Sequence, residues 1–200
     1  MANGSTWRNL EVIELSRLNM DPTILRHALG SLPNLRALKA SDMPSFNDDL
    51  FQHSDYVPAF PALTELIFTK TPNITTQGLC NYLLRADTQN SLKVLLLTTT
   101  GVHPSTLQQI LLQAPNLTKL SLVEQITTSF PAASNIPPLQ SRSLKILHYE
   151  ISAAASANAY ASTASTYYAY LANSLVVGGL PALHELYVRG KSSCLTHGTY

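Results

Sequence analysis

Cysteine and charge are both scarce in this sequence. Two cysteines, Cys80 and Cys194, are too few for a disulfide framework. Charged residues make up only 12% of the chain, and 13 basic against 12 acidic side chains give a formal net charge of +1. This balance provides no general attraction for nucleic acid or for an anionic membrane, so neither is expected as a partner. The low cysteine content favours a reducing intracellular location, in the cytoplasm or the nucleus.

Long apolar runs and familiar catalytic motifs are also absent. No stretch approaches the roughly 20 apolar residues that a membrane span requires, and the polar start over Met1 to Arg8 does not resemble a signal peptide. The sequence contains no nucleophile elbow, P-loop, zinc-protease or dinucleotide-binding motif. Cys194 and His197 form a lone Cys-x-x-His pair, whereas a zinc site needs about four ligands. We therefore expect no catalysis, no cofactor and no metal.

Three other reactive or acidic groups have ordinary structural interpretations. Cys80 lies in a leucine-rich helical segment, where a buried and inert thiol is expected. His103 precedes Pro104 and is expected at the start of a helix rather than paired with Cys80 as a nucleophile. Asp48 and Asp49 are expected in a loop or at a helix start, where carboxylates are favourable.

What the sequence does contain is an internal repeat. The pattern Leu-x-x-Leu-x-Leu, with other apolar residues replacing some leucines, occurs seven times. The copies begin at positions 10, 35, 63, 92, 117, 144 and 183. Their spacings are 25, 28, 29, 25, 27 and 39 residues, and the first five lie within the 20–29 residue period of leucine-rich repeats.

The repeat predicts an α/β fold. Each hexapeptide is expected to form a short strand whose fourth and sixth side chains point into the core, followed by a helical return segment. Asp21 and Pro22 form a helix start, and helical spacing of leucines extends over 76–86 and 104–114. We predict a leucine-rich-repeat solenoid, or horseshoe, with about seven short parallel strands on the concave face and helices on the convex face.

Two segments depart from the repeat. Residues 126–142 are rich in proline and predict an irregular loop. Residues 153–175 carry Ala, Ser and Tyr at three- and four-residue steps and predict a long convex helix, with a flexible low-complexity insert as the alternative. The chain is therefore read as a single array over 1–190, and 191–200 as a tail that fits no repeat.

One stretch carries a more specific motif. The third strand segment is followed by Ile74-Thr75-Thr76-Gln77-Gly78-Leu79, and Pro-Asn-Leu precedes the second and fifth strand segments. These residues resemble the cysteine-containing leucine-rich repeats of F-box proteins, although the cysteines that name that repeat type are replaced by apolar or small residues. The resemblance covers about residues 7–190, and it implies a eukaryotic subunit that recognises the substrate of an SCF-type ubiquitin ligase. No segment before Trp7 could hold an F-box, so we expect a fragment of a longer protein that would contact the ligase adaptor only through a missing F-box.

The third and fifth motif positions point away from the core, and on a solenoid they line the concave face. Strongly apolar residues occupy the middle of this face, which is typical of a contact surface. We therefore expect a protein target there. The alternative is that the 126–142 loop or missing sequence covers these side chains. The predicted contact residues are Glu65, Ile67, Val94, Leu96, Lys119, Ile146, His148, Glu185 and Tyr187.

Two other functions remain open at this stage. One is a leucine-rich scaffold unrelated to ubiquitin. The other is a regulator such as a GTPase activator, which needs a well-placed arginine or asparagine at a repeat edge. Arg17, Arg142 and Arg189 share no recognisable context for that role. The sequence does not identify the target or the oligomeric state.

Overall fold

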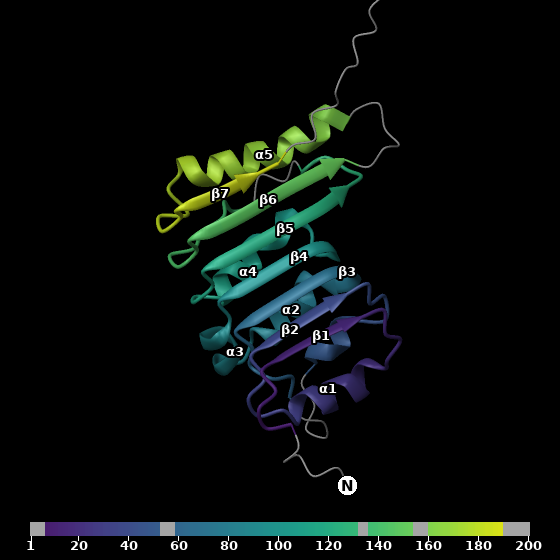
Figure 1. The fold of residues 1–200 in the computed structure, drawn as a ribbon. Coiled ribbons are helices and arrows are strands. Elements are labelled where there is room, and N and C mark those ends of the chain that lie inside the picture. The colour runs from purple at the N-terminus through teal and green to yellow at the C-terminus, as the bar shows by residue number, and fades with distance from the viewer. Residues whose placement is uncertain (1–6, 53–58, 132–135, 154–159, 190–200) are drawn as a thin grey trace, which may run out of the picture.

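The computed structural model of the chain describes residues 7–52, 59–131, 136–153 and 160–189. Seven parallel strands form a single open sheet, and each strand pairs with the next one along the sequence. Figure 1 shows them side by side, with helices α2 and α4 behind the sheet. The strands are β1 (Val12–Ser16), β2 (Ala37–Ser41), β3 (Glu65–Thr75), β4 (Val94–Gly101), β5 (Lys119–Ile126), β6 (Ile146–Ala153) and β7 (Glu185–Val188). The predicted α/β fold with seven parallel strands is confirmed.

The register of the sheet follows the repeat. Every strand begins at the third motif position, and equivalent positions pair across the sheet, so that Leu66 lies between Leu38 and Leu95. At the fourth and sixth motif positions in strands β2 to β6, no residue is more than 1% exposed. These side chains belong to one core cluster that also contains buried helix residues such as Leu79 and Leu107, so the ladder supplies the strand side of a single apolar core. The strand residues are Leu38, Ala40, Leu66, Phe68, Leu95, Leu97, Leu120, Leu122, Leu147 and Tyr149.

Return segments connect the strands on one side of the sheet, and most contain a helix. The α-helices are α1 (Pro22–Gly30), α2 (Thr76–Tyr82), α3 (Ala86–Ser91), α4 (Leu107–Gln113) and α5 (Tyr160–Val176). Two short 3₁₀ helices, η1 (Asp48–Phe51) and η2 (Pro104–Thr106), complete the return segments. Asp21 caps α1 as predicted, because its carboxylate accepts a hydrogen bond of 2.8 Å from the Thr23 amide.

The Ile-Thr-x-x-Gly-Leu segment has a clear structural explanation. Thr75 caps α2 and is itself held by Asp48 of η1, whose carboxylate accepts bonds from the Thr75 amide (2.8 Å) and hydroxyl (2.6 Å). Gly78 leaves room for this carboxylate, since a Cβ there would lie 2.1 Å from an Asp48 oxygen. The glycine is therefore needed because two successive return segments approach closely.

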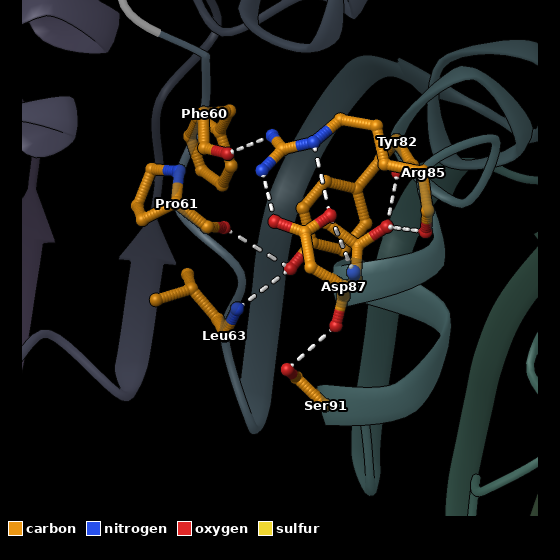
Figure 2. A network of polar contacts seen from close by, with 8 residues as sticks. Phe60, Pro61, Leu63, Tyr82, Arg85, Asp87 and Ser91 are labelled. Atoms are coloured by element: carbon orange, nitrogen blue, oxygen red, sulfur yellow. Dashed lines mark hydrogen bonds and ion pairs between the residues drawn. The ribbon is translucent and has the colours of Figure 1, made fainter.

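The helix expected over 76–86 ends at Tyr82, and a second helix, α3, begins at Ala86. Figure 2 shows why: polar contacts collect where α2 ends and α3 begins. The Tyr82 hydroxyl accepts from the Leu63 amide at 2.8 Å and donates to the Pro61 carbonyl at 3.2 Å. The Arg85 guanidinium donates to the Phe60 carbonyl and pairs with Asp87. These bonds fix the turn against the start of β3 and end α2 at Tyr82.

The two segments that depart from the repeat pack on each other. Phe130 stacks on Tyr170 at 4.5 Å between ring centroids and meets Tyr167 edge-on at 5.1 Å. The Tyr167 hydroxyl donates to the Thr128 carbonyl at 3.1 Å, and that of Tyr170 donates to the Pro137 carbonyl at 2.7 Å. Residues 127–131 and 136–142 are irregular, and α5 begins later than the predicted 153, because β6 continues to Ala153. Tyrosines on α5 thus anchor the proline-rich loop on the helix side of the sheet.

An unusual backbone conformation recurs directly after β1 and β2 and inside β3 and β4. Arg17, Asp42, Lys70 and Thr99 all occupy the eighth motif position and all have φ between 52° and 57°. The Arg17 amide still reaches the Ser41 carbonyl at 3.1 Å, and the Asp42 amide reaches the Thr69 carbonyl at 2.8 Å. Lateral hydrogen bonds therefore continue at Arg17 and Asp42, and β3 and β4 pair again at Thr71 and Thr100, although left-handed conformations are unfavourable for residues with a side chain.

We expect Thr99→Gly to stabilise the fold. A β-branched residue in the left-handed region costs roughly 1–3 kcal/mol, and the entropy cost of glycine offsets part of the gain, so the free energy of unfolding should rise by about 1 kcal/mol. Thr98→Gly, at an extended neighbouring position, is the matched control and should lower stability. Urea unfolding measures both, and a Thr99→Gly chain no more stable than wild type would contradict the strain.

In β5 the eighth motif position is occupied by a buried carboxyl, that of Glu124. Glu124 is 8% exposed, and its side chain accepts bonds from the Thr100 amide (2.6 Å) and hydroxyl (2.7 Å). Burial raises the pKa of Glu124 above its ordinary value, and the two bonds from Thr100 offset part of that shift. Because the folded chain binds this proton more tightly than the unfolded chain, Glu124 makes stability fall as pH rises from its ordinary pKa through the raised one.

Glu124→Gln should remove that pH dependence while keeping an acceptor for Thr100. The free-energy difference between the variant and wild type should therefore shift in favour of the variant as pH rises through this window, and become constant above it. Urea unfolding at a series of pH values measures the difference. Glu124→Ala also removes the acceptor, and it should be less stable than Glu124→Gln at every pH. A difference that does not change with pH would contradict the raised pKa.

Candidate functional site

The sheet face opposite the helices, here called the open face, carries the side chains of the third and fifth motif positions. The strand register places these side chains in two continuous rows that cross the sheet. The third-position row contains Glu65, Val94, Lys119, Ile146 and Glu185. The fifth-position row contains Ile67, Leu96, Ser121, His148 and Tyr187. All nine predicted contact residues thus lie on one face.

These nine side chains differ in exposure. Lys119, Glu185 and Tyr187 are exposed, with Tyr187 at 55%, and the other six are partly exposed. The partial exposure of the apolar members follows from neighbouring strands, whose side chains on the same face shield one another.

A groove of about 360 Å³ hollows this face over β4 to β7. Six of the nine predicted residues line it, together with Ser121, while Glu65, Ile67 and Val94 lie outside it on β3 and β4. Leu96 and Ile146 provide apolar surface, and Lys119 and Glu185 place opposite charges on either side of Ile146 in the third-position row. The groove therefore combines apolar and charged side chains on one surface.

Polar contacts organise the groove. The Ser121 hydroxyl lies 3.1 Å from Nδ1 of His148, and Nε2 of His148 lies 3.4 Å from a Glu150 oxygen. The His148 and Tyr187 rings meet edge-on at 6.3 Å. The Tyr187 hydroxyl donates to Glu185 at 2.8 Å, and this bond, with the nearby negative charge, raises the pKa of Tyr187. Glu150 was not among the predicted residues, although its place two residues after His148 puts it on the same face.

Ser121, His148 and Glu150 have the order of a nucleophile, a base and an orienting carboxylate. A hydrolase also needs hydrogen-bond donors directed at the developing oxyanion. Ser121 lies inside β5, between paired strands on both sides, where the strand amides are used in the ladder. Its side chain is also buried, with 8% of the residue exposed. The arrangement therefore lacks the backbone donors that usually stabilise the acyl-transfer transition state.

The described part of the proline-rich loop does not cover the groove. Phe130 and the carbonyls of Thr128 and Pro137 contact α5, on the helix side of the sheet. The alternative that residues 126–142 shield the predicted contact residues is therefore wrong for residues 127–131 and 136–142.

The other residues considered from the sequence have structural roles. Cys80 is buried, and burial raises the pKa of its thiol. His103 caps η2 by accepting from the Ser105 amide at 3.2 Å, as expected for a helix start, and burial lowers its pKa. Cys194 and His197 lie outside the described residues. Within the described ranges, no cluster of three or more His, Cys, Asp or Glu is placed to hold a metal ion.

A second hollow, of about 490 Å³, was not anticipated from the sequence. It lies beside the network of Figure 2, and Phe60, Tyr82, Leu84 and Arg85 are among its lining residues. The polar groups of Tyr82 and Arg85 already bond to the Pro61, Leu63 and Phe60 backbone and to Asp87, so they stabilise the fold. We therefore place the candidate site on the open face.

Comparison with known proteins gives no relative. No family profile matches the chain, and neither a curated protein nor a solved structure shows significant similarity to it. In the part of the chain that the structure describes, no helix combines the length and the apolar character needed to cross a bilayer.

The absence of oxyanion donors around Ser121 can be tested directly. We expect a fluorophosphonate probe to leave Ser121 unlabelled at neutral pH, because attack would build negative charge with no donor to stabilise it. Intact-mass spectrometry measures labelling, with a serine hydrolase in the same tube as the positive control. Labelling that disappears in both Ser121→Ala and His148→Ala would contradict this interpretation.

Proposed function

We propose that the chain is a leucine-rich-repeat solenoid. Three observations support this finer fold class: the spacing of 25 to 29 residues between the first six motifs, the pairing of equivalent positions in all six strand pairs, and the return of the chain on the helix side. Each unit has apolar surface that only its neighbours cover, which is the physical basis of repeat architectures.

We further propose that the open face, concave in such a solenoid, binds another protein and that the chain catalyses no reaction. The observation that carries this proposal is the groove over β4 to β7, where apolar Leu96 and Ile146 lie among charged and aromatic side chains. An exposed tyrosine such as Tyr187 gives a large contact area with little loss of side-chain entropy. Rigid strands hold these side chains in place before binding, which reduces the entropy cost of association.

The role we propose for this binding is substrate recognition in an F-box-type SCF ubiquitin ligase, with the adaptor held through an F-box outside these 200 residues. Support comes from the motif over 74–79, in which Thr75 bonds to Asp48 of the preceding return segment and Gly78 leaves room for that carboxylate. The target would be bound by shape and charge, and the ligase would modify it.

A leucine-rich scaffold or a regulator, for example of the GTPase-activating type, is the alternative. The arginines that a GTPase activator could use do not converge. Arg17 follows β1 and lies 3.3 Å from Asp42, while Arg189 follows β7 at the other end of the sheet. Arg142 precedes β6 and therefore lies near the N-terminal ends of the strands, whereas Arg17 and Arg189 follow the C-terminal ends of theirs. This placement favours recognition over GTPase activation.

The test is capture by wild type and by Ile67→Asp with Leu96→Asp. The two carboxylates would place charge in the middle of the open face, so bound proteins should fall at least tenfold, which corresponds to about 1.4 kcal/mol. Crosslinking in cell extract followed by quantitative mass spectrometry measures the loss, and circular dichroism checks the fold. Leu112→Asp, at a 67% exposed position on α4, is the matched control and should capture as wild type does.

Tyr187→Ala probes the same face without placing charge in the sheet, and it should weaken capture of the same proteins. Equal capture by all variants would exclude the open face.

An excess of residues 1–200 should lengthen the half-life of a captured ubiquitination target, because it competes without delivering the target to a ligase. An unchanged half-life would favour the scaffold alternative.

A further inference from the structure

The last strand differs from the others in its burial. Leu186 and Val188 occupy the fourth and sixth motif positions of β7, yet they are 40% and 49% exposed. Their paired counterparts on β6, Leu147 and Tyr149, are fully buried. All four residues of β7 are exposed, and within the described residues β7 pairs only with β6. As Figure 1 shows, β7 lies at the edge of the sheet.

An edge strand with free backbone groups and exposed apolar side chains is a template for another strand. The sequence of this edge, Glu185-Leu186-Tyr187-Val188-Arg189, is complementary to itself when read in reverse. In an antiparallel pair centred on Tyr187, Glu185 faces Arg189 of the second copy and Leu186 faces Val188, while the two Tyr187 rings meet. Opposite charges and apolar pairs at facing positions stabilise a sheet.

We infer that two copies of this chain pair through β7 to form a closed dimer. A two-fold axis perpendicular to the sheet keeps both helix layers on one side and joins the two open faces. Leu186 and Val188 then lie on the helix side and cover one another across the axis, while both Glu185–Arg189 pairs lie on the open face. The Tyr168 hydroxyl donates to the Arg189 carbonyl at 2.8 Å, which holds the backbone directly after β7 for this pairing.

The other edge of the sheet does not offer the same match. An antiparallel pair of β1 strands centred on Glu14 would place two glutamates opposite each other, which is destabilising. Head-to-tail stacking of β7 on β1 in the register of the repeat would place Glu185 beside Val12 and Arg189 beside Ser16, with no charge pair. It would also be open-ended, whereas an isologous pair closes at two copies. The charge pattern therefore selects β7 pairing with β7.

The test is sedimentation equilibrium of the purified chain over a range of concentrations. Wild type should pass from the 21.8 kDa monomer to twice that mass. Glu185→Arg turns both attractive pairs into repulsive ones and should weaken the dimer by about tenfold or more. Adding Arg189→Glu to the same chain reverses both charges, restores the complementarity and should restore the dimer.

Recovery in the double variant is a result that a folding defect in Glu185→Arg would not give. Ile67→Asp with Leu96→Asp, on strands β3 and β4, should dimerise as wild type does, which separates this inference from the proposed partner site. A monomer at every concentration would overturn the dimer. So would a dimer that Glu185→Arg leaves unchanged, or species larger than two chains.

Discussion

Lateral pairing of equivalent positions is the constraint on which the rest of this structure depends. A single strand of four to eleven residues cannot bury its own leucines, and in β2 to β6 the two core-facing side chains of each motif are buried among neighbouring strands and helices. Because the register is parallel and without offset over the six motif positions, the same motifs that give the core also give two uninterrupted rows on the open face. Core and candidate site are therefore two consequences of one ladder.

This constraint explains where the structure deviates from its pattern. Four residues after or within β1 to β4 adopt left-handed conformations, and lateral hydrogen bonds continue through two of them, Arg17 and Asp42. The proline-rich loop and α5 depart from the pattern of the other return segments, and Tyr167 and Tyr170 of α5 bond to the backbone of the loop. Both departures are accommodated on the helix side, so they leave the register of β5 and β6 intact.

The same ladder gives its two ends a distinct chemistry. Interior strands have their core-facing positions closed, whereas β7 leaves Leu186 and Val188 accessible beside Glu185 and Arg189. Among the described residues, the outer edge of β7 has no paired strand, and it runs alongside the groove on the open face, to which Glu185 and Tyr187 contribute. In a dimer joined at β7, the two grooves would be adjacent and could bind a repetitive or two-fold symmetric partner with greater avidity.

The sequence by itself determined the number of strands, their order and the nine side chains on the open face, because hydrophobic periodicity is local and repeats along the chain. It did not determine the strand bounds, since every strand begins two residues after its motif does. It also indicated the cap at Asp21 and the place of His103 at a helix start, because each residue precedes a proline. Only the tertiary structure decided that Tyr82 and Arg85 end α2 early, that the loop packs on α5, and that Ser121, His148 and Glu150 meet in the groove. These features depend on contacts between residues that are distant in sequence or lie on different strands. Such contacts leave no periodic pattern in the sequence, because they depend on which side chains the strand pairing places next to one another.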